Sequence, residues 1–354
     1  MRFYHSILKY IVPAIMLLLS LSACDFVSFG DGVTGDNQNN QTAPLSLAVS
    51  SNDVAWTPWY FAEEKGLFNS SKIPYELKLI SDTYQGTIDK FISKEVDAVA
   101  ISNIDAVTQI VRRDIKVDVI LITNNHQGNE AILLHEGADK TLTGKNIALV
   151  QYSARHYLLD RYLGRHQIPY DTVKIINTEE LEIPNKMVNK EVYGVVTQNP
   201  NLYKLIHSTS AKMVFDSRKI PKEIFDIIIV HRDTLVDHPE FADVLLKAWF
   251  SVMKKLQGNR KGQVLDALAN LAHMSRQDYD EQLLSNPLND TPLKAMIAIR
   301  NRRVLKKSMR HLRYFVERHA LNGNKPFSSW VSYPGRTPAL LHFNDKPLRR
   351  FISR

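Results

Sequence analysis

The feature that most constrains the fold is an alternation of short strand-like segments with helix-like segments, which begins at Leu45. Residues 45–50 alternate as a strand, and residues 58–68 follow a helical pattern that ends at Gly66. Further segments of both kinds follow, with strands expected over 75–80, 96–101, 118–123 and 131–134 and helices over 86–93 and 105–112. This order predicts an α/β fold with a mainly parallel sheet, helices on both faces, and ligands beyond the carboxyl ends of the strands.

A second series of the same kind begins at Gly144 and predicts a second lobe. It comprises a strand from 144, a helix over 156–165 and strands over 173–176 and 193–197. Residues 225–230 read as a strand that returns to the first lobe, and the chain from 239 onward is mostly helical. About 310 residues from Leu45 exceed what one hydrophobic core usually serves. We therefore expect lobe 1 over 45–134, lobe 2 over 135–229, and the lobe 1 return with C-terminal helices over 230–354, with crossings near Leu134 and Val230.

The amino terminus has the layout of an export signal. Basic residues precede an apolar run over 11–21, which is shorter than the roughly 20 residues needed to span a bilayer. The run ends in Leu21-Ser-Ala-Cys24, which resembles the bacterial lipobox, and Cys24 is the only cysteine of the chain. We expect a lipoprotein signal peptide over 1–23, a lipid on Cys24 and a polar, flexible tether over 24–44. The alternative is an export signal whose last residues happen to include a cysteine.

The charge of the chain is unevenly distributed. Its formal net charge is +8, and the excess lies between Arg300 and Arg318 and near the carboxyl terminus. No aromatic stacking motif accompanies these residues, so nucleic-acid binding is not expected. On an exported protein such a basic helix is a solvated face or a contact with anionic headgroups.

The stretch from Ala55 to Phe68, Ala-Trp-Thr-Pro-Trp-Tyr-Phe-Ala-Glu-Glu-Lys-Gly-Leu-Phe, resembles the opening of nitrate-, sulfonate- and taurine-type periplasmic binding proteins (the NitT/TauT, NMT1-like family). The segments 95–100, 227–230 and 233–242 fit the same superfamily, so the resemblance spans most of the mature chain. It implies the type II, Venus-flytrap fold, with two doubly wound α/β lobes and a ligand cleft between them.

A narrower resemblance is to the binding proteins associated with urea carboxylase, which implies a urea-like or guanidine-like ligand. It is carried by short segments in a fixed order: Trp56-Thr-Pro-Trp59, Ser102-Asn-Ile-Asp-Ala-Val-Thr108, Gly128-Asn-Glu130, Tyr152-Ser-Ala-Arg-His-Tyr-Leu-Leu159 and Val196-Thr-Gln-Asn-Pro200. The chain departs from that pattern at Tyr60, Glu130 and Gln198, where a small residue, Asp and Trp are expected.

Each of these segments falls where a predicted strand ends, so each supplies candidate ligand contacts. From lobe 1 we predict Trp56 and Trp59, which alternatively fill the core, and Asn103 and Asp105, of which Asp105 alternatively caps the next helix. Glu130 follows a polar loop directly before an apolar strand. From lobe 2 the predicted contacts are Tyr152, Ser153, His156, Thr197, Gln198 and Asn199, although Ser153 is also a helix cap and His156 a candidate structural hydrogen-bonding residue.

Two of these candidates bear on the ligand's charge. If Asp105 and Glu130 both enter a dry cleft, two carboxylates without a cation would cost several kcal/mol. A planar cation such as guanidinium would offset that cost with forked N–H donors. A nitrate or sulfonate would instead need helix amino termini or basic side chains, and the segments offer only Arg155 and His156.

The sequence therefore predicts a binding protein and no enzyme. It lacks a Gly-rich phosphate loop, a nucleophile elbow and His pairs at metal spacing, so no cofactor, no metal and no catalytic residue is expected. The resemblance implies a monomer that delivers a small molecule to an ABC permease and, through it, to an ATPase. Asp25 after Cys24 resembles the signal for the periplasmic face of the inner membrane. The alternatives are a sulfonate, taurine, nitrate or pyrimidine-precursor ligand, or a sensory binding lipoprotein.

Overall fold

The computed structural model describes residues 44–354 except 51–52, 70–76 and 324. Contacts divide the chain into two units, Met1–Gln41 and Thr42–Arg354, and the described residues belong to the second. The predicted signal peptide, Cys24 and all of the tether but its last residue lie outside the described residues. Within the described ranges, none of the helices has the length and apolar character needed to cross a membrane.

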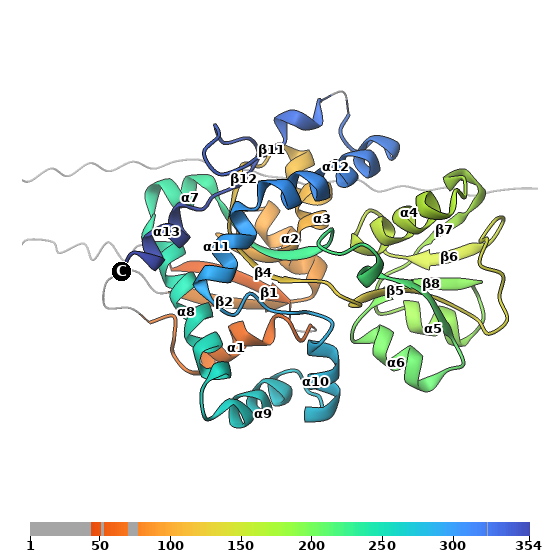
Figure 1. Cartoon of the computed structure of the whole chain (residues 1–354), viewed down its shortest axis with the longest axis horizontal. Helices are drawn as coiled ribbons and strands as arrows, with labels where there is room; N and C mark the ends of the chain where they lie inside the picture. The colour runs from red at the N-terminus through yellow and green to blue at the C-terminus, as the bar shows by residue number, and fades with distance from the viewer. Residues whose placement is uncertain (1–43, 51–52, 70–76, 324) are drawn as a thin grey trace, which may run out of the picture. The chain divides into compact units, whose positions relative to one another are not determined.

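Lobe 1 contains a seven-stranded sheet in the order β11-β12-β4-β10-β3-β1-β2 (Figure 1). The pairings are parallel except those of β10, which runs antiparallel to both β3 and β4. The strands are β1 Leu45–Ser50, β2 Leu77–Asp82, β3 Ala98–Ser102, β4 Val117–Asn125, β10 Phe225–His231, β11 Val331–Ser332 and β12 Leu341–Phe343. The parallel strands share one carboxyl edge, and the antiparallel β10 brings its amino end to that same edge.

The helices of lobe 1 pack on this sheet and on one another. α2 lies against β1, β2 and β3, α11 lies against β4, and α1 packs on α8 and α9. Before β10 the helical segments are α1 Thr57–Glu64, α2 Tyr84–Ile92, α3 Asn103–Asp105, η1 Ala106–Ile110 and η2 Val111–Arg113. After β10 they are α7 Arg232–Asp237, α8 Glu240–Gln257, α9 Lys261–Leu271, α10 Arg276–Leu283, α11 Pro292–Arg300, α12 Arg302–Arg318, η5 Phe327–Ser329 and α13 Lys346–Ile352.

Lobe 2 contains a five-stranded sheet in the order β7-β6-β8-β5-β9, with α4 on one side and α5 and α6 on the other (Figure 1). Its strands are β5 Glu130–Leu134, β6 Asn146–Leu149, β7 Lys174–Asn177, β8 Gly194–Gln198 and β9 Lys212–Asp216. Its helical segments are α4 Ala154–His166, η3 Tyr170–Thr172, α5 Ile183–Val188, α6 Asn201–Ser208 and η4 Ser217–Lys219. The two-lobed α/β architecture expected from the sequence is thus confirmed.

The crossings between the lobes differ from the predicted positions near Leu134 and Val230. β5 pairs antiparallel with β8 and β9, so it belongs to lobe 2, and the first crossing lies between β4 and Glu130. β10 pairs with β3 and β4 of lobe 1, so the return crossing lies between Asp216 and Phe225. Strand patterns locate these elements, but an isolated apolar strand carries no information about which sheet it joins.

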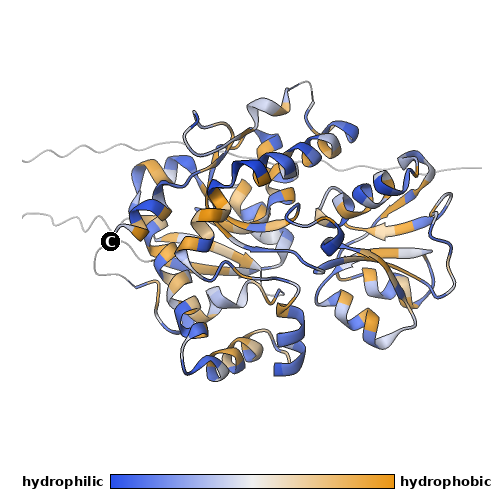
Figure 2. Cartoon of the chain, viewed as in Figure 1, coloured by the Kyte–Doolittle hydropathy of each residue, from blue (hydrophilic) through white to orange (hydrophobic). Residues whose placement is uncertain are grey.

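The core follows the pattern of a sheet covered on both faces. β1, β3, β5 and β10 are buried along their whole lengths, which explains their nearly continuous apolar sequences (Figure 2). Two carboxylates interrupt this pattern at the amino ends of antiparallel strands, Glu130 on β5 and Asp226 on β10. Because a buried charge needs a partner, these positions mark where the sheets meet a polar site.

Candidate functional site

A cluster of buried ionisable side chains lies at the edges of the two sheets that face the crossings. Asp53 follows β1, Asp105 follows β3, and His126 follows β4. Asp226 and Glu130 stand near or at the amino ends of β10 and β5. All five are less than a tenth exposed, and both lobes contribute to the cluster.

His126 connects carboxylates of the two lobes. Its Nδ1 pairs with Glu130 Oε1, and its Nε2 lies 2.9 Å from Asp226 Oδ2. Burial by itself lowers the pKa of His126, but the charges of Asp226 and Glu130 outweigh it and raise the pKa well above 6.5. The imidazole is therefore a fixed cation, and Glu130 Oε2 remains buried without a hydrogen-bond partner.

Asp53 is a buried carboxylate whose ionisation is disfavoured by its surroundings. Its Oδ1 accepts a hydrogen bond from the N–H of Ala55 at 2.8 Å. Burial, with a further contribution from the charge of Asp226, raises the pKa of Asp53 from 3.8 to about 7. At neutral pH the Asp53 carboxyl is consequently protonated in part of the molecules and ionised in the rest.

Arg155, in the first turn of α4, faces lobe 1 from lobe 2. Its Nη1 donates to Gln198 Oε1 at 2.8 Å, and its Nε lies 3.3 Å from Glu180 Oε2. The guanidinium also lies over the ring of Tyr84, 5.9 Å from the centroid. Tyr84 in turn donates to Asp105 Oδ2 at 2.9 Å, so a cation–aromatic pair joins the lobes beside a carboxylate.

Carboxylates outnumber cations in this part of the structure. Five carboxylates and two cationic groups interact electrostatically with one another here: Asp53, Asp105, Glu130, Glu180 and Asp226 against His126 and Arg155. Four of these carboxylates are less than a tenth exposed, whereas the side chain of Glu180 is a quarter exposed, so the buried part of the cluster holds two more carboxylates than cations. Such an excess is costly unless a further cation enters.

Three buried asparagines brace the cluster. Asn124 Nδ2 donates to Asp226 Oδ2 at 2.8 Å and to Asn286 Oδ1 at 3.2 Å. Asn286 Nδ2 donates to Asn129 Oδ1 at 3.0 Å, and Asn129 Nδ2 is buried without an acceptor. The network fixes the first crossing against the loop that follows α10, and it leaves one amide donor and one carboxylate oxygen unpaired within the same few residues.

Several predicted site residues meet in this cluster. Asp105 and Glu130 belong to it, and Gln198 reaches it through Arg155. Ser153 acts as the cap of α4, because its Oγ accepts the N–H of Arg155 at 3.2 Å. Ser102 likewise caps α3, whereas Asp105 was the predicted alternative cap of this helix. The hydroxyl of Ser102 also donates to Asp105 Oδ2 at 2.6 Å.

Three other predicted residues form hydrogen bonds with neighbours of the cluster or with the crossing segments. Thr197 Oγ1 donates to Glu180 Oε1 at 2.6 Å. Asn103 Nδ2 donates to the carbonyl of Glu223 at 3.0 Å, and its Oδ1 accepts the N–H of Phe225, which fixes the return crossing. Asn199 Nδ2 donates to Ser285 Oγ at 3.1 Å and joins the lobes.

The two predicted tryptophans are buried in lobe 1. Trp59 is fully buried, and its ring stacks on Phe68 at 6.3 Å and packs against Trp249 at 5.2 Å. Trp56 is 2% exposed and its backbone N–H donates to the carbonyl of Asp53. The contacts of Trp59 are those of a core side chain, whereas Trp56 is tied to the loop that carries a site carboxyl. Ligand contact by either indole remains a prediction.

Tyr152 and His156 lie in a second, separate cluster at the junction of α4 with α12. His156 Nδ1 accepts the N–H of Tyr152 at 3.0 Å, and its ring packs on Phe315 and His319. Burial, together with His319, lowers the pKa of His156 to about 3. The imidazole is therefore a neutral hydrogen-bonding group, and its predicted ligand contact receives no support from these neighbours.

The predicted site did not include five residues that the structure brings together here: Asp53, Tyr84, His126, Arg155 and Asp226. Asp226 left a recognisable signal, since it is a lone carboxylate within the apolar strand Phe225-Asp-Ile-Ile-Ile-Val. The others lie in polar loops or first helical turns, where a charged side chain is unremarkable. Their convergence requires the crossing geometry, which the sequence pattern does not contain.

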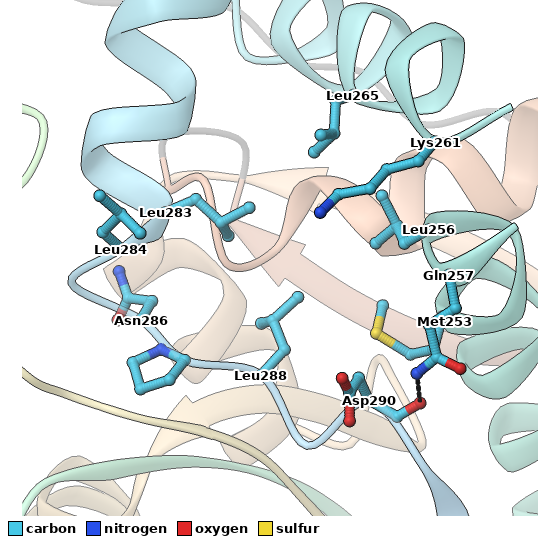
Figure 3. Close-up of a pocket in the computed structure, with 11 residues that line it drawn as sticks. Met253, Leu256, Gln257, Lys261, Leu265, Leu283, Leu284, Asn286, Leu288 and Asp290 are labelled. Carbon is cyan, nitrogen blue, oxygen red and sulfur yellow. Dashed lines mark hydrogen bonds between the residues drawn. The ribbon is translucent and has the colours of Figure 1, made fainter. Parts of the chain in front are cut away.

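Two cavities lie apart from the centre of this cluster. One, of about 480 Å³, is lined by apolar side chains of α8, α9 and the loop after α10, with Lys261 and Asp290 at its rim (Figure 3). The other, of about 380 Å³, is a groove with walls from both lobes. There Tyr203 of α6 donates to Asp278 Oδ1 of α10 at 2.7 Å and to Glu281 Oε2 at 3.2 Å, so the lobes also meet at this groove.

No group of three His, Cys, Asp or Glu side chains within the described residues is arranged to hold a metal ion. The polar cluster instead presents carboxylate oxygens, one guanidinium and amide groups from two lobes. Two α/β lobes with a buried polar site at their crossings define the class of two-lobed periplasmic-type binding folds.

The chain belongs to the NMT1/THI5-like family, which it matches over residues 54–255. It shares the fold of the alkanesulfonate-binding protein SsuA from Xanthomonas axonopodis pv. citri bound to MOPS (14% identity, TM-score 0.65, 79% of this chain and 95% of that chain covered). A similar likeness holds for the periplasmic aliphatic sulphonate binding protein SsuA from Escherichia coli (11% identity, TM-score 0.66, 81% and 96% covered). The ligand-binding component of an ABC-type import system from Staphylococcus aureus, with zinc bound, is also similar (13% identity, TM-score 0.61, 82% and 97% covered). No curated protein matches the chain by sequence.

Proposed function

We propose that this protein is the exported, lipid-anchored solute-binding component of an ABC importer, and that its ligand is a small nitrogen compound of the guanidine or urea type. The family membership and the two-lobed fold support a binding role without catalysis. The lipid anchor rests on Cys24 and the export signal before it. Within the nitrogen compounds, the charges of the site favour a cation.

The observation that carries the ligand assignment is the excess of buried carboxylates shared between the lobes. Glu130 Oε2 is buried and unpaired, and Asp53 is partly protonated near neutral pH. A guanidinium ion would supply positive charge and forked N–H donors to both. The ring of Tyr84 lies 5.9 Å from the guanidinium carbon of Arg155, and this cation–aromatic contact supports a preference for planar cations.

An anionic ligand fits these surroundings less well. A sulfonate would approach Arg155, but this guanidinium is already paired with Glu180 and bonded to Gln198. It would also be repelled by the carboxylates of Asp105 and Glu130. Sulfonate, taurine, nitrate or a pyrimidine precursor is therefore the second choice of ligand.

The proposed mechanism is closure of the lobes on the ligand. The segments between β4 and β5 and between β9 and β10 would act as hinges, and contacts such as Tyr203 with Asp278 would form on closure. A ligand held by carboxylates of both lobes stabilises the closed form, because in the open form it could contact the carboxylates of only one lobe at a time. Docking on the permease would reopen the lobes.

The test is calorimetric titration of the body, residues 42–354, with guanidinium, urea, taurine and nitrate at fixed ionic strength. Saturable binding of guanidinium, with weaker or no binding of the two anions, is the expected result. Tight binding of taurine or nitrate would retain the binding role and refute the assignment of a cation.

The anchor has its own test in cells. Replacing Cys24 by Ala is expected to abolish incorporation of labelled fatty acid and to change the location of the protein, while the purified Cys24→Ala variant binds its ligand like the wild type. Unchanged fatty-acid labelling in the Cys24→Ala variant would refute the anchor.

A further inference from the structure

A strip of exposed cations runs along α12. Arg303, Lys306, Lys307 and Arg310 are all exposed, and their spacing places them within about 100° on one side of the helix. Tyr314, 46% exposed, continues the same side one turn further. We call these five residues the α12 strip.

The opposite side of α12 is fixed in the core. Leu305, Met309, Leu312, Phe315 and Val316 are buried, so the helix cannot rotate to hide its cations. The strip is thus a permanent feature of the surface, presented by a helix of 17 residues.

The four cations of the strip are not neutralised by the protein itself. The ion pairs of α12 involve other positions, with Arg313 pairing with Glu317 and Arg318 pairing with Asp160. No described residue forms an ion pair with any of the four. The sequence explains this, because residues 291–316 contain no Asp or Glu.

We propose that the α12 strip binds the anionic headgroups of a lipid bilayer and so holds the body against the membrane surface. Clustered Lys and Arg on an amphipathic helix are attracted to anionic lipid, and an exposed tyrosine suits the headgroup level. A protein partner is the weaker fit, because interfaces between proteins are depleted in Lys, which supplies half of the cations here.

The position of Cys24 before the body supports a lipid bilayer as the binding partner of the α12 strip. An anchor at Cys24 would lie 20 positions before Pro44, the first described residue, so even a fully extended chain would keep the body within about 70 Å of the membrane. Under such tethering, weak electrostatic contacts suffice to orient the body. The headgroup contact itself needs neither the anchor nor the ligand, so it stands independently of the proposed function.

The experiment measures binding of the body, residues 42–354, to vesicles by sedimentation. Both sheets and the core lie within this unit, which can therefore be studied without the signal peptide. Vesicles of phosphatidylcholine with 30% phosphatidylglycerol are compared with pure phosphatidylcholine, at low salt and at high salt. We expect binding only to the anionic vesicles, and its loss at high salt, where charges are screened within a few ångströms.

A pair of matched variants locates the contact. K306Q/K307Q removes two charges from the strip and should lower the partition coefficient about 25-fold, at about fivefold per basic residue. K254Q/K255Q removes two exposed neighbouring lysines from the end of α8 and should change it less than threefold. Unfolding curves for both variants guard against misfolding.

Three results would overturn the proposal: no binding to anionic vesicles, equal binding to neutral vesicles, or equal losses in the two variants. The first of these, combined with capture of a polyanionic protein by the strip, would assign the surface to a protein partner. Titration with guanidinium on the same variants reports separately on the proposed ligand, which should bind them unchanged.

Discussion

The raised pKa of Asp53 makes cation binding dependent on pH in a range where few carboxyls titrate. A cation in the cluster favours the ionised carboxylate, so binding should expel the proton of Asp53. Burial and Asp226 place the pKa at about 7 in the ligand-free protein. His126, whose pKa is raised well above 6.5, stays charged over this range, and the pKa of Glu130 is lowered, so neither confuses the signal.

The magnitude follows from the ionised fraction of Asp53. This fraction rises from about 10% at pH 6 to about 90% at pH 8 for a pKa near 7. The affinity for guanidinium should therefore rise about tenfold between pH 6 and pH 8, equivalent to roughly 1.4 kcal/mol. Affinity for neutral urea should stay constant, because urea does not change the charge beside the carboxyl.

The assay is calorimetry at pH 6, 7 and 8 in two buffers of different protonation enthalpy, which counts released protons directly. Wild-type protein should release about half a proton per guanidinium at pH 7, where half of Asp53 is protonated. Asp53→Asn should abolish both the release and the pH dependence. A flat affinity in the wild type, or an unchanged slope in Asp53→Asn, would refute the reasoning.

The same substitution has a consequence for stability. A carboxyl whose pKa is raised in the folded state destabilises the fold when it is ionised. For Asp53 this destabilisation is zero below pH 3.8, the unfolded-state pKa, grows as the pH rises, and reaches its full value above about pH 7. Asp53→Asn should then stabilise the ligand-free body at pH 8 by up to about 4 kcal/mol and leave it unchanged near pH 3. Denaturant unfolding at both pH values checks this, and equal effects at both would show a packing effect instead.

Three further substitutions separate the charge, core and closure contributions. Glu130→Gln should weaken guanidinium binding at least tenfold and leave urea binding within a factor of two, by calorimetry; equal losses for both would contradict the charge argument. Trp59→Ala should lower the free energy of unfolding by about 3–5 kcal/mol in denaturant melts, since its ring packs in the core, and calorimetry on the same variant tests its predicted ligand contact. An affinity loss without destabilisation would show ligand contact. Tyr203→Phe, which removes the bonds to Asp278 and Glu281, should raise the ligand dissociation rate three- to tenfold by stopped flow; an unchanged rate would mean that these bonds do not hold the lobes closed.

Sequence patterns located most elements because local physics decides them. The strand β1 appears at the predicted residues, and α2 and β3 lie within two residues of their predicted bounds. Apolar periodicity and capping residues act over a few residues, so they can be read without knowledge of the fold. β9 was missed, since its sequence Lys-Met-Val-Phe-Asp is short and partly exposed.

The positions of the crossings could not be predicted from local sequence patterns. β5 and β10 both read as buried strands, but pairing partners far away in the sequence determine which lobe each joins. The crossings consequently lie up to about a dozen residues before their predicted positions.

The sequence by itself indicated two α/β lobes, which the structure confirms, and it predicted an export signal before them. It also singled out Asp105 and Glu130 as carboxylates at strand ends. Only the tertiary structure decided that Asp53, His126 and Asp226 join them, and that Trp59 is a core residue by its contacts. The physical reason is that charge and burial at a site depend on what converges there. Side chains that follow β1 and β4 meet those of β5 and β10 only after both crossings are made, and their mutual electrostatics then sets which groups are charged.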